Sequence, residues 1–322
     1  QMDKNYSFEK EYTTVIVLPF KTTYKTDNKT IETSPEKAVQ EITKALLHLN
    51  MRTMLFLKNI KQIQYRLSEK NGKIDSDSYY RYIKKLDNYL NLVNIKNSNK
   101  FDDEQEIKSE QYLVFSREYA ENVPPIEIAF QYQDKHKDEK DKEIPAQILP
   151  MSEQNTRHCV TFATGQNTGL HFLLQGDYNT TVNRESLEKD DNKNNKLIKE
   201  AAELLGDILP KIKQMGLLSV DFLNALPIKN SDEYDELYRP LAEKTLELLK
   251  TGEYLPTNDG KFVSPENAVL AYAQDLTELL SSQQLTQLLG KTTESHWMTR
   301  EITRDKNTNL RQYMKENGRA HV

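Results

Sequence analysis

The chain has 322 residues, enough for two or three domains that each bury a core of their own. Hydrophobic residues make up 37% and charged residues 29% of it, which indicates a well-solvated globular protein and argues against a disordered one. The formal net charge of −5 argues against a general binder of nucleic-acid backbones, so a nucleic-acid partner is not indicated.

Membrane segments and disulfides are not expected either. The sequence holds no run of about 18 apolar residues, so no transmembrane helix is predicted. The first residues, QMDKNYSFEKEY, lack the apolar stretch of a secretory signal. Cys159 stands alone, which excludes an intrachain disulfide and fits a reducing compartment. We therefore expect a cytoplasmic protein.

The first third of the chain is expected to alternate between strands and helices. Residues 12–20, YTTVIVLPF, are β-branched and aromatic and predict a strand. After a polar linker, Ser34-Pro35-Glu36 predicts the start of a helix that continues to about Asn50. A buried run at 54–57 follows, and then a strand over 60–67 that Asn71-Gly72 turns into a hairpin.

The apolar and tyrosine spacing of residues 78–95 fits a helix better than a strand. We interpret its tyrosines as half-buried packing groups with wet hydroxyls, not as a base-stacking surface. Two polar segments, 96–110 and 134–143, are predicted to be solvated, mobile loops. The strands that they separate are expected at 111–115, 126–132, 144–149, 159–164 and 170–176. This order predicts an α+β or mixed α/β sheet domain with a helix at each end.

The last part of the chain is expected to be mainly helical. Residues 195–215 predict a long helix with one apolar face. A second helix is predicted over 233–251, ending at Gly252, followed by a short hairpin over 254–263. Ser264-Pro265-Glu266 predicts another helix start, with further helices at about 275–289 and 306–316 and with Trp297 as a packing anchor between helices.

The stretch Thr168–Glu188, TGLHFLLQGDYNTTVNRESLE, carries the strongest chemical signal. It predicts a buried strand, a turn at Gly176-Asp177, and a polar loop that presents Arg184 before the next helix. An arginine in such a loop is either a solvated or salt-bridged surface charge, or a guanidinium offered to phosphate oxygens, which it matches bidentately.

The order G-D-…-N-R-E-S-L after the TGLHF strand resembles the middle, or transducer, domain of GHKL-type ATPases, and most of all sacsin-like proteins and the heat-shock-protein-90 family. The resemblance implies that Arg184 reaches the γ-phosphate of ATP. It also implies that ATP and Mg²⁺ are held by a separate domain and that Asn183 and Glu188 lie at the nucleotide. The family chaperones carry a glutamine where this chain has Glu188.

The same resemblance implies an organisation for the whole chain. Residues 1–33 are expected to be the last strand of a truncated ATPase domain plus a linker. Residues 34–228 would be the transducer domain, a mixed β-sheet with flanking helices and a βαβ crossover, and residues 229–322 a smaller, mainly helical segment. The expected partners are the N-terminal ATPase domain of the same chain and a client protein or a second copy.

An ATP site of the chain's own is not expected, because the sequence lacks an acidic-asparagine helix, a D-x-G-x-G turn and a glycine-rich lid. The chain therefore resembles a piece of a larger ATPase that is inactive alone. The alternative interpretation is a non-catalytic binding or scaffold module. Lys193, Lys196 and Lys199 could offer further positive charge near a nucleotide, while Asp190-Asp191 is better explained as a helix entry.

No spacing typical of a metal site is present. A nucleophilic pair of Cys159 with His158 or His171 is conceivable, but His158 is disfavoured, because neighbouring residues on a strand point to opposite faces. Cys159 is expected to be a small buried apolar residue.

Overall fold

The computed structural model describes residues 23–26, 29–32, 34–47, 49–68, 74–101, 104–271, 275–302 and 307–317. The chain divides into two compact units. The first comprises residues 1–50 and 65–74, and the second comprises residues 51–64 and 75–322. The strand predicted at 12–20 and the turn predicted at Asn71-Gly72 lie outside the described residues.

The first unit holds a short hairpin and a helix. Strands β1 (Thr23–Thr26) and β2 (Lys29–Glu32) pair antiparallel, and α1 spans Pro35–Leu47. The Ser34 Oγ accepts a hydrogen bond from the Lys37 N–H at 3.2 Å, which caps the helix as predicted. Ile42, on the predicted apolar face, stays exposed.

A large mixed sheet organises the second unit, and its edge strand β3 passes into the first unit at Tyr65. Its strand order is β12-β11-β13-β7-β6-β5-β4-β3, and β10 pairs with β7. The strands are β3 (Gln62–Ser68), β4 (Ile74–Lys85), β5 (Leu90–Phe101), β6 (Glu104–Arg117), β7 (Ile126–Gln133), β10 (Gln147–Leu149), β11 (Arg157–Val160), β12 (Phe162–Asn167) and β13 (Leu173–Gln175). The predicted α+β class is therefore confirmed.

The βαβ crossover that the resemblance implies is not found among the described strands of this sheet. The parallel pair is β11 with β13, and the chain passes between them through β12, which pairs antiparallel with β11. The connection is thus a hairpin and a loop, without a helix.

The helix predicted for 78–95 is wrong, because this segment belongs to β4 and β5, which pair antiparallel with Arg81 opposite Ile95. Apolar residues three and four apart satisfied a helical pattern, but burial alternates as in a strand. Tyr79 and Arg81 are buried while Tyr82 is exposed. The first buried run, 54–57, is confirmed and follows a short 3₁₀ helix, η1 (Met51–Met54).

The loop predicted for 96–110 is also wrong, since this segment continues β5 and β6. Lys96 pairs with Ser109 and Asn97 with Lys108. The polar side chains misled the prediction, because ladder hydrogen bonds satisfy the backbone of a hairpin whatever its side chains are. The polar segment 134–143 forms another hairpin, with β8 (His136–Lys137) paired to β9 (Glu143–Ile144).

Two predicted strands are interrupted. The strand at 144–149 divides into β9 and β10 around Pro145, which has no N–H to give to a ladder. The strand at 159–164 divides into β11 and β12 at Thr161, whose φ of 67° turns the chain back.

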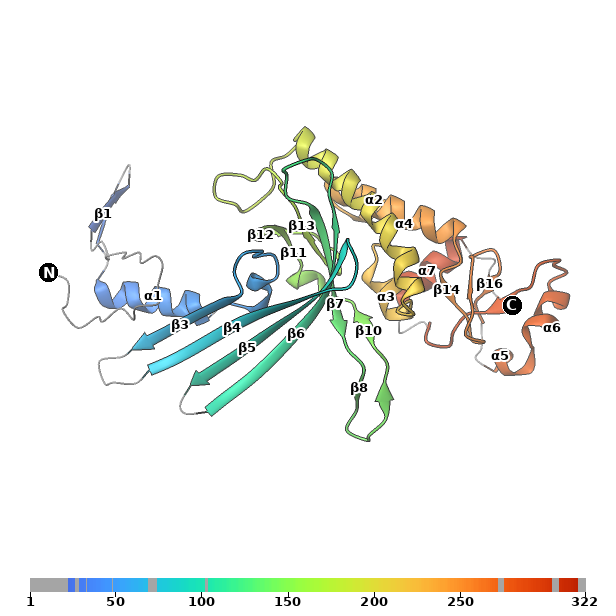
Figure 1. The fold of residues 1–322 in the computed structure, drawn as a ribbon. Coiled ribbons are helices and arrows are strands. Elements are labelled where there is room, and N and C mark those ends of the chain that lie inside the picture. Colours follow the sequence, from blue (N-terminus) through green and yellow to red (C-terminus); the bar gives the residue numbers. More distant parts are fainter. Residues whose placement is uncertain are drawn as a thin grey trace. The chain divides into compact units, whose positions relative to one another are not determined.

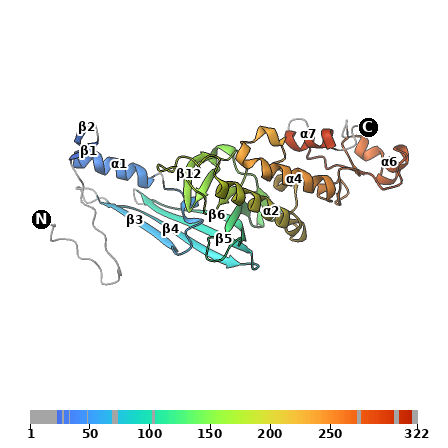
Figure 2. The ribbon, with the colours of Figure 1, turned by 90° about the horizontal axis from the view of Figure 1, so that it is seen from above.

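The long helix α2 (Asn192–Gln214) confirms the prediction for 195–215, and Asp191 caps it by accepting a hydrogen bond from the Asn194 N–H. Its predicted apolar face is buried: Leu197, Ala201, Leu204, Leu205, Ile208 and Ile212. This face packs against β6 and β7, where Phe130 contacts Phe172 and Phe222. Helix α4 (Arg239–Thr251) lies beside α2 (Figures 1 and 2).

The remaining elements are short. They are η2 (Glu153–Asn155), α3 (Val220–Ala225), η3 (Ser231–Glu233), η4 (Glu236–Tyr238), β14 (Leu255–Pro256), β15 (Phe262–Val263), β16 (Ala268–Val269), α5 (Leu276–Leu279), α6 (Ser282–Leu288), β17 (His296–Trp297) and α7 (Thr308–Asn317). Gly252 caps α4 as predicted, and the hairpin predicted at 254–263 is confirmed by β14 and β15.

The helix predicted to start at Ser264 is wrong, because a turn there leads into β16, which pairs parallel with β17. Trp297 is confirmed as an anchor. It is buried, and its indole N–H donates to the Leu280 carbonyl at 2.9 Å. Within the described ranges, no helix combines the length and the apolar character that a bilayer span requires.

Candidate functional site

Arg184 lies in a closed loop between β13 and α2, here called the Arg184 loop (Asn179–Glu188). Thr180 and Leu187 form an isolated antiparallel bridge, and the Glu188 N–H donates to the Asn179 carbonyl at 3.0 Å. The two ends of the loop are therefore joined, and its tip forms a compact turn.

Short polar groups fix this turn. The Arg184 N–H donates to the Thr181 carbonyl at 2.8 Å. The Asn183 Oδ1 accepts from the Thr181 hydroxyl at 2.8 Å and from the Glu185 N–H at 3.2 Å. Arg184 itself has φ of 59°, a left-handed conformation that costs a residue with a Cβ about 1–2 kcal/mol. The surrounding hydrogen bonds hold the arginine in a conformation that it would not choose alone.

The Arg184 loop covers the outer edge of strand β12. The Gly165 N–H donates to the Arg184 carbonyl at 3.2 Å, and the Leu187 N–H donates to the Gln166 Oε1 at 2.7 Å. A Cβ at Gly165 would lie only 2.7 Å from the Glu185 carbonyl oxygen. Close approach of loop and strand therefore requires glycine at 165, a residue that sequence reasoning did not single out.

A buried asparagine anchors the loop to helix α2. The Asn194 Oδ1 accepts from the Asn179 N–H at 2.8 Å, and its Nδ2 donates to the carbonyls of Asn179 and Glu188 at 2.9 and 3.2 Å. Sequence reasoning missed Asn194 as well. Its only signal was a position in the first turn of a helix, where asparagine is common for ordinary capping reasons.

The guanidinium of Arg184 stays at the surface. Its Nη2 donates to the Val160 carbonyl at 2.5 Å, and no carboxylate of the described residues forms an ion pair with it. Val182, two residues earlier, is 104% exposed. The loop thus presents an uncompensated positive charge beside an exposed aliphatic side chain.

Of the other predicted site residues, some stabilise the Arg184 loop or the start of α2, and the rest have no role in holding the loop. Asn183 is exposed and is occupied in fixing the turn, and Glu188 has an exposed side chain. Lys193 forms an ion pair with Asp177 at 2.8 Å, while Lys196 and Lys199 project from α2 into solvent. The helix entry predicted at Asp190-Asp191 is confirmed by the Asp191 cap.

His158 and Cys159 point away from each other, as predicted. His158 packs toward the helices, with its Nδ1 3.0 Å from the Tyr238 hydroxyl, and burial lowers its pKa to about 3. Burial raises the pKa of the Cys159 thiol to about 12. A neutral histidine and a protonated thiol on opposite faces cannot act as a nucleophilic pair.

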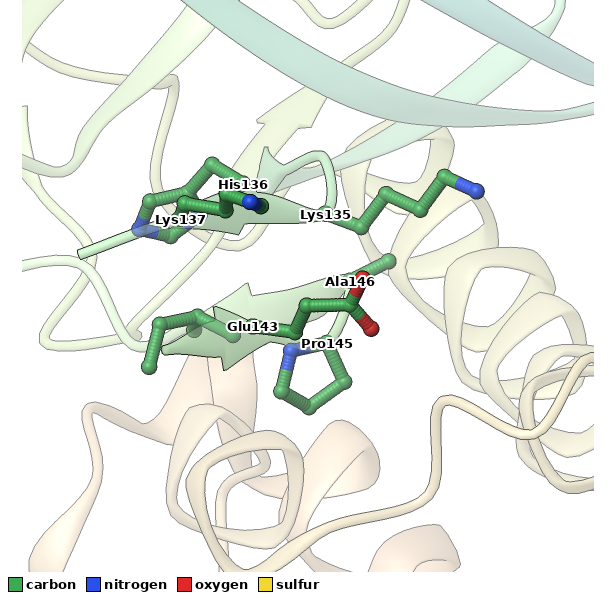
Figure 3. Close-up of a pocket in the computed structure, with 7 residues that line it drawn as sticks. Lys135, His136, Lys137, Glu143, Pro145 and Ala146 are labelled. Carbon is green, nitrogen blue, oxygen red and sulfur yellow. The ribbon is translucent and has the colours of Figure 1, made fainter. Parts of the chain in front are cut away.

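A surface hollow of ≈ 570 Å³ lies at the β8–β9 hairpin. It is lined from one arm of the hairpin by Lys135, His136 and Lys137 and from the other arm by Glu143, Ile144, Pro145 and Ala146 (Figure 3). Of the buried polar atoms that lack a partner in the described part of the chain, none belongs to this lining. Its polar lining side chains, Lys135, His136, Lys137 and Glu143, are all exposed to solvent, so the hollow is a weaker candidate than the Arg184 loop.

Comparisons of the chain with known proteins assign it to no family. No protein-family model matches the chain, and no curated protein or solved structure matches it. No group of three or more histidine, cysteine or acidic side chains is placed to hold a metal ion among the residues that the structure describes.

Proposed function

We propose that the chain is the transducer region of a larger GHKL-type ATPase, of the heat-shock-protein-90-like or sacsin-like kind, and that Arg184 contacts the γ-phosphate of ATP bound with Mg²⁺ in a separate N-terminal domain. The observation that carries the proposal is the exposed Arg184 guanidinium, which has no described carboxylate partner and sits on a loop fixed by β12 and α2. The parent protein would act in the cytoplasm, on a client protein or as a homodimer.

The chemistry follows from the donor geometry. A guanidinium carries five N–H donors, and one is used on the Val160 carbonyl. The others can meet phosphate oxygens bidentately once a second domain excludes water from the loop. Asn183 then serves as a positioning residue, because its Oδ1 already fixes the turn. The exposed Glu188 carboxylate suits Mg²⁺ better than it suits phosphate oxygens.

The sheet lends the proposal no support of its own, since the described strands lack the implied βαβ crossover. One observation favours the alternative function, a non-catalytic binding or scaffold module. Under this alternative, the guanidinium of Arg184 serves only to hold its own loop against the β11–β12 turn, through its hydrogen bond to the Val160 carbonyl.

Nucleotide turnover and nucleotide affinity of the full-length protein separate the two functions. Under the proposal, Arg184→Ala lowers turnover strongly and leaves ATP affinity nearly unchanged, and Arg184→Lys restores only part of the turnover, since an ammonium lacks the bidentate fork. Lys189→Ala, which removes an exposed positive charge just beyond the loop, is the matched control and should turn over ATP normally. Under the scaffold function, all three variants behave like the wild type.

The chain by itself is expected to bind ATP weakly and not to hydrolyse it, because the sequence lacks a phosphate-cradling loop and a magnesium-holding constellation. Titration calorimetry with MgATP on the purified chain tests this. Micromolar affinity would show that the nucleotide site lies in this chain. That result would contradict the proposal that a separate domain holds the ATP.

A further inference from the structure

The sheet of the second unit has a stretch of open surface far from the Arg184 loop in sequence. Strand pairing places Tyr80 opposite Lys96 and Tyr82 opposite Asn94. Since side chains on a strand alternate between faces, Tyr80, Tyr82, Lys84, Asn94, Lys96 and Ile107 share one face, here called the open sheet face. Figure 1 shows β4, β5 and β6 continuing beyond the part of the sheet that lies against α2.

The open sheet face exposes side chains that a folded domain normally covers. Tyr82 is 55% exposed and Ile107 is 66% exposed, and Lys84 and Lys96 are exposed beside them. On the opposite face of the same strands, Asp77, Tyr79 and Arg81 are buried. Neither Tyr82 nor Ile107 belongs to the hydrophobic core of the described residues, so the core does not need these two side chains.

The charge of this face differs from that of the chain. The chain carries a net charge of −5, whereas the described residues of the open sheet face include two lysines and no carboxylate. The Lys96 Nζ lies 5.9 Å from the centre of the Tyr82 ring. Asp134 stands at the rim, where its N–H donates to the Gln111 Oε1 at 3.3 Å.

We propose that the open sheet face binds an extended acidic segment of a partner protein. Lysine ammoniums, tyrosine hydroxyls and the Asn94 amide are donors that suit carboxylates, and Tyr82 and Ile107 supply apolar contact between them. A single-stranded nucleic acid fits less well, because Lys96 occupies the face of the Tyr82 ring on which a base would stack. Two lysines in an acidic chain also neutralise few phosphates.

Fluorescence anisotropy with three labelled probes tests the proposal on the whole chain: a glutamate-rich peptide, its lysine-for-glutamate counterpart and an oligothymidine. The glutamate-rich peptide should bind, and more weakly as salt is raised. The double variant Lys84→Ser/Lys96→Ser should weaken that binding about tenfold, the scale of two exposed ion pairs. The lysine-rich peptide should not bind.

The matched control is the double variant Lys85→Ser/Lys108→Ser, which removes the same charge from β4 and β6 on the opposite face. It should bind the glutamate-rich peptide like the wild type. Tyr82→Ser, at an exposed position, gives a second variant if the first double variant does not fold by circular dichroism. Equal loss in both double variants, tighter binding of the oligothymidine, or no binding of the acidic peptide would each overturn the proposal.

Discussion

Two basic side chains at the hairpin of β11 and β12 have opposite environments. His158, on β11, is enclosed between the sheet and Tyr238, and burial keeps it neutral. Arg184 lies against the turn of the same hairpin, at the surface and charged. A buried basic group gives up its charge and serves the core, whereas an exposed one keeps its charge and can serve a ligand.

The two environments also differ in what holds them together. The interior side of the hairpin depends on side-chain packing around Phe130 and α2. The Arg184 loop depends on hydrogen bonds from its main chain to the Gly165 N–H and to the Asn194 side chain. Of its two aliphatic side chains, Leu187 is buried in the core and Val182 at the tip is fully exposed. Changes inside should therefore cost global stability, and changes in the loop should cost function or local order.

The largest expected effect lies in the core. Phe130→Ala should lower the free energy of unfolding by about 3–5 kcal/mol, because it leaves a cavity among the Phe115, Phe172 and Phe222 rings. Val182→Ala, at the loop tip, should change it by less than about 0.5 kcal/mol. Urea denaturation measures both. Similar losses of unfolding free energy in the two variants would contradict the proposed difference between the interior and the loop.

His158 should make stability depend on pH. The pKa is about 3 when folded and 6.5 when free, so between these values the unfolded chain binds one more proton. Stability should therefore fall as the pH drops below 6.5, by up to about 1.4 kcal/mol per pH unit. His158→Gln should flatten this slope in denaturation curves, and Arg184→Ala should leave it unchanged. A slope that survives in His158→Gln would assign it to other groups.

Gly165→Ala should push the Arg184 loop away from strand β12. The new Cβ would meet the Glu185 carbonyl at 2.7 Å, so we expect a loss of about 1–3 kcal/mol and faster hydrogen exchange confined to the Arg184 loop. Gly206→Ala in α2 is the control. Its Cβ would meet only the flexible Lys244 side chain at 3.2 Å, and alanine favours a helix by about 0.5–1 kcal/mol. Equal destabilisation by both variants would contradict the close-approach role of Gly165.

Only a small effect on stability is expected at Arg184 itself. Arg184→Ala removes one hydrogen bond to Val160 and almost no packing, so the free energy of unfolding should change by less than about 1 kcal/mol. A thermal melt of the purified chain checks this. A loss of several kcal/mol would mean that the main role of the guanidinium is to hold its own loop against Val160.

Sequence patterns predicted the elements whose signals are local and redundant. Helix α2 has a long apolar face and the Asp191 cap, and the α+β class follows from such elements. The strand at 111–115 was predicted and lies in β6. Strands β4 and β5 and the start of β6 were missed, because the tyrosines and leucines of 78–95 fit a helical spacing and the 96–110 segment is largely polar. Only the pairing of distant residues, such as Lys96 with Ser109, reveals the strands.

The candidate site was predictable only at its tip. Arg184 and Asn183 stood out through residue type and motif, but the residues that hold the loop did not. Gly165 matters because of one tertiary contact with Glu185, and Asn194 because its side chain reaches two carbonyls across the loop. Such contacts leave no trace in periodicity or composition.

The turnover of ATP by full-length Arg184→Ala tests the central claim most directly. If the loop delivers the guanidinium to the γ-phosphate, turnover should fall by about 10³-fold at saturating ATP while the Kd for ATP stays within about twofold of the wild type. A fall of less than about threefold in a folded variant would show that Arg184 contributes no more than a surface charge does.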